Sequence, residues 1–171
     1  MKSLSLAFLI CALYSLPALP QSTASGTTDQ NFVEFAAQTD MTEAHLGQLA
    51  ADQASGQNIK DFAQMLVADH TNDYKQLASV AGKASMDVPK GLDAAHNKMV
   101  APFEKLKGAA FDRRYAHEMV VGHQKAIAQY QQESENGSNP EIKAYATQAL
   151  PTLEKHLQAA KELTPAKGTK K

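Results

Sequence analysis

One stretch of the chain decides the fold: Phe62-Ala63-Gln64-Met65-Leu66-Val67-Ala68-Asp69-His70-Thr71-Asn72-Asp73. Its apolar residues recur at the three-then-four spacing of a helix with one buried face, and His70 interrupts that face midway. Three other segments carry a similar apolar stripe, and each is interrupted near its middle by one polar residue. These residues are Glu43, His123 and His156. The pattern predicts four packed helices crossed by one buried polar layer.

Length and composition favour a single all-α domain. The chain has 171 residues, of which 43% are hydrophobic, and this is enough for one core. Tryptophan is absent and β-branched runs are few, which favours helices over a sheet. The formal net charge is −1 and no basic stripe is present, so nucleic-acid binding is not expected.

The first residues have the form of a secretory signal peptide. Lys2 gives a positive start, residues 4–16 are apolar, and residues 22–24 fit a cleavage site. The apolar stretch is short for a membrane span, which needs roughly 20 residues. We expect residues 1–24 to be removed and the protein to be exported, to the periplasm or outside the cell, without a stable membrane span. A retained N-terminal anchor is the alternative.

Turn signals divide the rest of the chain. We expect a linker over residues 25–30, a helical bundle over 31–163 and a flexible basic tail over 164–171. Asp29 and Asn58 are expected to cap the helices that follow them. Within the bundle, the periodicity and the turns predict long helices over 30–54, 59–81, 109–135 and 140–163, with a crossover and a short helix over 82–108.

A faint internal repeat suggests how the helices pair. The stretch Ile59-Lys60-Asp61-Phe62-Ala63 resembles Ile142-Lys143-Ala144-Tyr145-Ala146, and each follows a turn. Phe32 and Phe111 each begin the preceding long helix. The sequence therefore predicts two helical hairpins joined by the crossover.

Distances from the turns place the polar residues at one level of the bundle. Glu43 and His70 lie 13 and 14 residues from Gly56, at the centre of the first turn. His123 and His156 lie at nearly equal distances from the turn of the second hairpin. Residues equally far from a hairpin turn lie side by side, so the four residues should meet.

Two interpretations of this layer stay open. The imidazoles and the carboxylate are suitable ligands for one ion of Zn, Mn, Fe, Ni or Cu, with Asp69, Asp73 and Glu118 as secondary candidates. Alternatively, the same groups satisfy one another by hydrogen bonds, because unpaired polar groups are costly in a core. His45 lies on the far side of its helix from Glu43 and is expected to be exposed.

Other chemistry finds no support in the sequence. It contains no phosphate-binding glycine loop, no Gly-x-Ser-x-Gly motif and no His-Glu-x-x-His motif. The single cysteine, Cys11, lies in the predicted signal peptide, so the mature chain would have neither a disulfide nor a thiol nucleophile. No catalytic residue or enzyme activity is identified.

Several motifs resemble a known family. They are Ala68-Asp69-His70-Thr71, Gly108-Ala109-Ala110-Phe111-Asp112-Arg113-Arg114-Tyr115, Met119-Val120-Val121-Gly122-His123-Gln124-Lys125-Ala126 and Leu150-Pro151-Thr152-Leu153-Glu154-Lys155-His156-Leu157. They resemble the bacterial exported family catalogued as domain of unknown function 4142, which belongs with the ferritin-like helical bundles. The resemblance implies an exported ferritin-like domain and no established activity. The chain lacks the Glu-x-x-His pairs of di-iron ferritins, so such a di-iron centre is not expected.

These observations lead to one leading hypothesis and two alternatives. The leading hypothesis is an exported bundle that binds a single transition-metal ion in its His/Glu layer, with a role in metal handling or envelope stress. The first alternative is a structural or interaction module whose polar layer sets helix register. The second is a metal-dependent redox enzyme. A second copy of the chain or an envelope protein is the expected partner.

Overall fold

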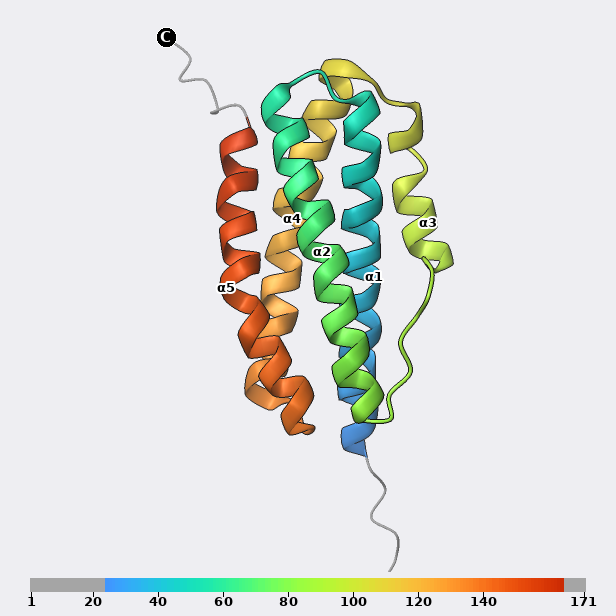
Figure 1. Cartoon of the computed structure of the whole chain (residues 1–171), viewed down its shortest axis with the longest axis vertical. Helices are drawn as coiled ribbons and strands as arrows, with labels where there is room; N and C mark the ends of the chain where they lie inside the picture. Colours follow the sequence, from blue (N-terminus) through green and yellow to red (C-terminus); the bar gives the residue numbers. More distant parts are fainter. Residues whose placement is uncertain (1–23, 165–171) are drawn as a thin grey trace, which may run out of the picture.

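The computed structural model describes residues 24–164, which form a four-helix bundle of two hairpins (Figure 1). No strand occurs in this range, and no helix in it is long and apolar enough to cross a membrane. The predicted all-α, ferritin-like architecture is confirmed. The elements are α1 (Ala24–Gln53), α2 (Gln57–Lys83), α3 (Ala94–Val100), the 3-10 turn η1 (Phe103–Lys105), α4 (Gly108–Asn136) and α5 (Pro140–Leu163).

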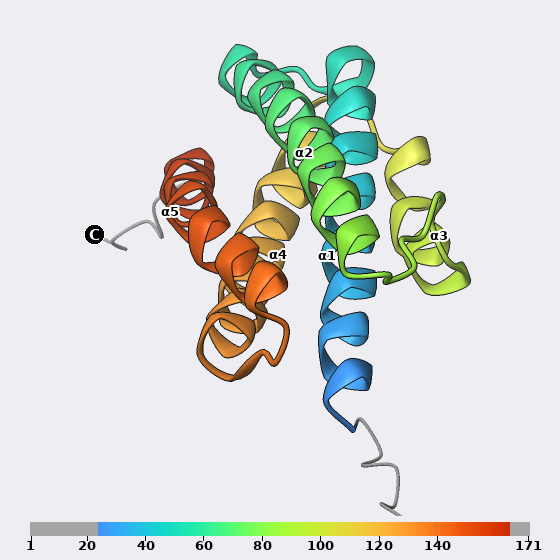
Figure 2. The same cartoon turned by 60° about the horizontal axis from the view of Figure 1, so that its bottom comes forward.

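The two hairpins pack side by side, and the crossover covers one of them. Figure 2 shows the α4–α5 hairpin on one side of the α1–α2 hairpin and α3 on the other. Gln38 of α1 holds the crossover in place. Its amide donates to the carbonyl of Gly91 at 3.0 Å and its oxygen accepts from Asp93 N at 3.1 Å. Because Gln38 is buried, these bonds fix α3 against α1.

The apolar core is divided into two clusters. One cluster surrounds Leu46, Leu66 and Phe111, and the other surrounds Leu77 and Ile142. Along every long helix, the residues of one cluster are separated from those of the other by a polar position. The polar layer therefore lies between two apolar clusters, where unpaired polar groups are costly.

The start of the chain differs from the prediction in two ways. Helix α1 begins at Ala24, so residues 25–30 belong to this helix and the predicted linker is wrong. Asp29 does not cap α1. Its carboxylate accepts hydrogen bonds from Ser138 N at 2.9 Å and Asn139 N at 2.7 Å, and so holds the turn of the second hairpin. The predicted signal peptide and the basic tail lie outside the described residues, apart from Ala24 and Thr164.

Asp112 of α4 likewise holds the turn of the first hairpin by hydrogen bonds. Its carboxylate accepts from Ser55 N at 3.0 Å, Ser55 Oγ at 2.5 Å and Gly56 N at 2.9 Å. Helix α2 has Gly56 at its N-cap and no side-chain cap of its own, so the predicted cap at Asn58 is wrong. A carboxylate from the other hairpin binds the turn instead.

The two aspartates follow the internal repeat. The separation between Asp29 and Asp112 equals that between Ile59 and Ile142, and it makes Tyr115, rather than Phe111, the counterpart of Phe32. Aromatic contacts agree with this correspondence, because Phe32 packs on Tyr145 and Phe62 packs on Tyr115, both at 6.3 Å between ring centroids.

We expect Asp112→Ala to lower the free energy of unfolding by about 1 to 2 kcal/mol, because three donors at the first turn lose their acceptor. Burial acts to raise the pKa of Asp112, but the hydrogen bonds from Ser55 and Gly56 outweigh it and hold this pKa below its ordinary value. The stabilisation is therefore present above the ordinary pKa of a carboxyl group and is lost as the pH falls through the lowered one.

Urea unfolding at pH 7 and at low pH measures this effect. The matched control is Asp52→Ala, which removes an exposed aspartate from α1. Equal stability of the Asp112 and Asp52 variants at pH 7 would show that the turn does not depend on the carboxylate.

Candidate metal centre

The four long helices bring Glu43, His70, His123 and His156 together at the middle of the bundle. Each helix contributes one residue, and none of the four is more than 4% exposed. These are the residues that sequence spacing placed at one level. Their role as metal ligands stays a prediction.

The four side chains lie within direct reach of one another. Glu43 Oε2 is 2.9 Å from His70 Nε2 and 3.3 Å from His123 Nε2. One ring nitrogen from each of His70, His123 and His156 lies within 4.8 Å of the other two. A tetrahedral ion with bonds of about 2.0 Å separates its ligand atoms by roughly 3.3 Å, so modest movements of the rings would close the centre around an ion.

Each imidazole is held in place by its second nitrogen. His70 Nδ1 is 2.8 Å from Asp40 Oδ1, His123 Nδ1 donates to the carbonyl of Met119 at 2.8 Å, and His156 Nε2 is 2.9 Å from Asp69 Oδ2. Metal-binding histidines commonly have such partners, which set the ring orientation and leave the other nitrogen free to bind.

Four atoms in the centre have no hydrogen-bond partner. They are Glu43 Oε2, His70 Nε2, His123 Nε2 and His156 Nδ1. Although His70 Nε2 and Glu43 Oε2 are close, their geometry is that of an ion pair rather than an aligned hydrogen bond. Buried polar atoms are rarely left unpaired, and here one comes from each long helix. Three nitrogens and one carboxylate oxygen suit Zn(II) or Cu(II).

His70 and Glu43 shift each other's pKa values in opposite directions. Burial acts to raise the pKa of Glu43, but the nearby imidazoles of His123 and His70 outweigh it and lower this pKa. Burial acts to lower the pKa of His70, but Glu43 and Asp40 outweigh it and raise this pKa well above its ordinary value. In the metal-free protein, these directions favour a protonated His70 beside an ionised Glu43. A bound metal ion would replace this positive charge.

Asp40 is a part of the centre that sequence spacing did not identify. It is 1% exposed, and burial raises its pKa to about 7. The sequence did contain an indication that Asp40 is near the centre. It lies three residues before Glu43 and so shares its face of the helix. Its role as the partner of His70 nevertheless depends on how α1 and α2 pack.

The secondary candidates have different positions. Asp69 contacts His156, Asp73 accepts a hydrogen bond from Tyr145 Oη at 2.7 Å, and Glu118 lines a separate pocket beside α1 and α4. His45 is half-buried rather than exposed, which corrects the expectation from its helix position.

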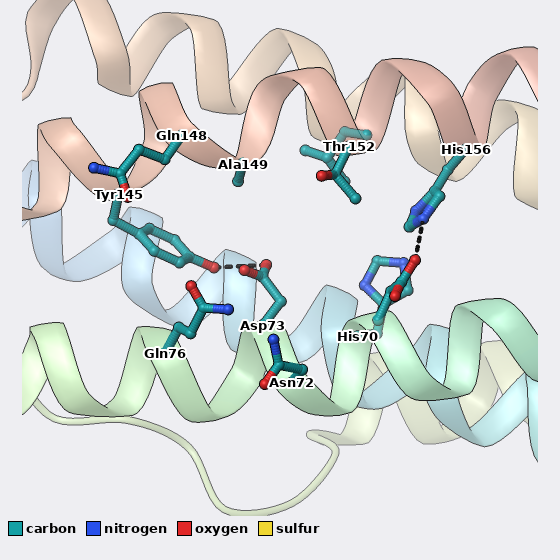
Figure 3. Close-up of a pocket in the computed structure, with 11 residues that line it drawn as sticks. His70, Asn72, Asp73, Gln76, Tyr145, Gln148, Ala149, Thr152 and His156 are labelled. Atoms are coloured by element: carbon teal, nitrogen blue, oxygen red, sulfur yellow. Dashed lines mark hydrogen bonds and ion pairs between the residues drawn. The ribbon is translucent and has the colours of Figure 1, made fainter.

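A pocket between α2 and α5 lies beside the centre. It has about 170 Å³ of space and polar walls. Figure 3 shows His70 and His156 at one end of this pocket and Asp73 with Tyr145 toward the other. An ion or a small molecule in this pocket would lie beside two of the imidazoles, whose nitrogens that face the centre are covered.

The fold and the layer define a class: a helical bundle with a buried histidine and carboxylate centre. The chain belongs to the family described as Domain of unknown function (DUF4142), whose sequence profile matches residues 15–163. A search of curated protein sequences finds no match.

Solved structures share the fold at low sequence identity. CopM in its Cu(II)-bound form is 18% identical, with a TM-score of 0.65 over 78% of this chain and 93% of that one. A DUF305 fragment from Deinococcus radiodurans is 16% identical, with a TM-score of 0.68 over 80% and 94%. A DUF305 protein from Streptomyces coelicolor, described as secreted, is 13% identical, with a TM-score of 0.65 over 80% and 89%. Such identities establish a common fold alone.

We expect Glu43→Gln to lower the stability of the metal-free protein by about 3 kcal/mol at pH 7, because it leaves the buried His70 cation with a weaker counter-charge. The lowered pKa of Glu43 sets the sign of the pH dependence. The difference in unfolding free energy between Glu43→Gln and the parent protein is present at pH values above the ordinary pKa of a carboxyl group. It shrinks as the pH falls through the lowered pKa of Glu43.

Chemical unfolding of chelator-treated protein tests this prediction. Glu34→Gln, an exposed change on the same helix, is the control and should have little effect. A Glu43→Gln variant as stable as the parent would mean that the buried charges do not depend on one another.

Proposed function

We propose that the protein binds one copper ion between His70, His123, His156 and Glu43 and acts in metal handling in the bacterial envelope. The observation that carries this proposal is the convergence of three imidazole nitrogens and one carboxylate oxygen, one from each long helix, at a buried point. The contacts between Glu43 and the imidazoles leave His156 Nδ1 without a partner. A cation would bind all four atoms at once.

The choice of copper rests on the donor atoms. Three imidazole nitrogens and a carboxylate oxygen bind Cu(II) more tightly than Mn(II), Fe(II), Ni(II) or Zn(II) in most sites of this kind. The structural neighbour CopM has Cu(II)-bound, Cu(I)-bound and Ag-bound forms, which supports the same class of ion. The predicted N-terminal signal peptide and a neighbour described as secreted support a location outside the cytoplasm.

Binding and transfer of the ion fit the site better than catalysis. The open pocket beside His70 and His156 gives an ion a route to exchange. That pocket is also the observation that favours the second candidate, a metal-dependent redox enzyme, because a small molecule could reach a bound ion there. Turnover of such a molecule by the copper-loaded protein would distinguish the two.

Purified protein without a histidine tag should bind about one copper ion per chain after incubation with Cu(II) and dialysis. Elemental mass spectrometry measures the ratio. The double variant His70→Ala, His123→Ala should lose the ion, because two of the three imidazoles are absent. His117→Ala removes an exposed histidine of α4 and should keep it.

A spectroscopic measurement keeps the proposal testable if the double variant does not fold. Electron paramagnetic resonance of the Cu(II)-loaded parent protein should show coupling to imidazole nitrogens. A parent protein that takes up none of Zn, Mn, Fe, Ni or Cu would contradict metal binding and would leave the layer as a structural network.

Gly122→Ala should weaken copper binding without unfolding the protein. A Cβ at this position lies 3.1 Å from Glu43 Oε1, so the carboxylate must shift by a few tenths of an ångström. Alanine favours a helix over glycine by roughly 0.5 to 1 kcal/mol, which offsets the crowding. We expect Cu(II) affinity to fall about tenfold, as for other changes to the groups around a metal.

Chelator competition measures this affinity. Gly82→Ala is the matched control, because its added Cβ meets no atom within 4 Å. Equal affinities for the Gly122→Ala and Gly82→Ala variants would argue against Glu43 as a ligand.

A further inference from the structure

Glu43 also borders a second pocket, on the face of the bundle where α1 and α4 lie beneath α3. This pocket has about 260 Å³ of space. The crossover forms its outer wall and is held there by the buried Gln38. The pocket is separate from the polar one between α2 and α5, and the two share no lining residue.

Soft donor groups line this second pocket. His96 and Met99 come from α3, and Met119 comes from α4. His96 and Met99 are three residues apart, so they share one face of their short helix. His96 Nδ1 is 2.8 Å from Asp93 Oδ1, which fixes the ring and leaves Nε2 free, as in the inner centre. Thioether sulfur and imidazole nitrogen together favour soft cations such as Cu(I).

Glu43 connects this pocket to the inner centre. Its Oε2 faces His70 and His123, and its Oε1 lies against Gly122, which lines the second pocket. The two oxygens of one carboxylate can therefore serve two cations. Apolar side chains such as Phe35 and Leu46 line much of this pocket, which disfavours a strongly hydrated divalent ion.

We propose that the pocket beneath α3 is a second cation site that binds a soft monovalent ion, Cu(I) or Ag(I), through Met99, Met119 and His96, with Glu43 shared between this site and the inner centre. The site goes beyond the proposed function, because it requires no ion between the three inner histidines. Together, the two sites place a soft-ion position beside a centre suited to Cu(II).

Silver titration of purified, untagged protein tests the proposal, with methionine methyl groups labelled with ¹³C and followed by NMR. The methyl signals of Met99 and Met119 should shift together and saturate. Met65, which is 39% exposed on α2, should not follow them. Met99→Leu keeps the side-chain volume and removes the sulfur, so it should lower Ag(I) affinity at this site at least about tenfold. Met65→Leu is the matched control.

The outcomes separate this proposal from the inner copper centre. Methionine shifts that persist in the His70→Ala, His123→Ala variant, or in a parent protein that binds no Cu(II), would support the outer site by itself. Unmoved Met99 and Met119 signals at saturating Ag(I), or shifts that appear only with those of Met65, would overturn the outer site. Cu(II) binding in that case would leave the inner centre intact.

Discussion

The buried carboxylate of Glu43 requires positive charge from other helices, and the rest of the bundle depends on this requirement. His70 of α2 supplies this charge 2.9 Å from Glu43 Oε2, and the imidazole of His123 on α4 lies 3.3 Å from the same oxygen, so the contacts of Glu43 join both hairpins. These contacts lie between two apolar clusters, where an unpaired charge would be strongly destabilising. A shift of either hairpin along the bundle axis would separate these charges. These contacts therefore favour one register of the two hairpins.

The internal repeat explains how the charges came to be complementary. The separation that relates Ile59 to Ile142 also relates Asp40 to His123 and Asp73 to His156. The first copy of the hairpin thus carries aspartates where the second copy carries histidines. Docking of the two copies brings acidic and imidazole groups together in one layer. The same docking makes each hairpin supply the carboxylate that holds the turn of the other.

The centre is buried between two pockets of different chemistry. The pocket between α2 and α5 presents carboxylates, amides and a tyrosine hydroxyl, whereas the pocket beneath α3 presents thioethers and an imidazole. Hard and borderline cations prefer the first set of donors, and soft cations prefer the second. Under the proposed function, an ion must arrive and leave without unfolding of the protein. The two pockets that border the centre support such an exchange, with modest movements of the rings.

The sequence by itself determined the helices, their pairing into hairpins and the level of the polar layer. These features follow from local periodicity and from the turns, and Glu43, His70, His123 and His156 lie together where their spacing placed them. Only the tertiary structure decided which group holds each imidazole and which carboxylate caps each turn. Asp40, Asp69 and Asp112 act on residues 30 or more positions away in the chain, and the helical start at Ala24 accompanies a contact between Asp29 and a turn more than 100 residues later. Helix periodicity reports which face of one helix is buried, but not which residue of another helix that face meets.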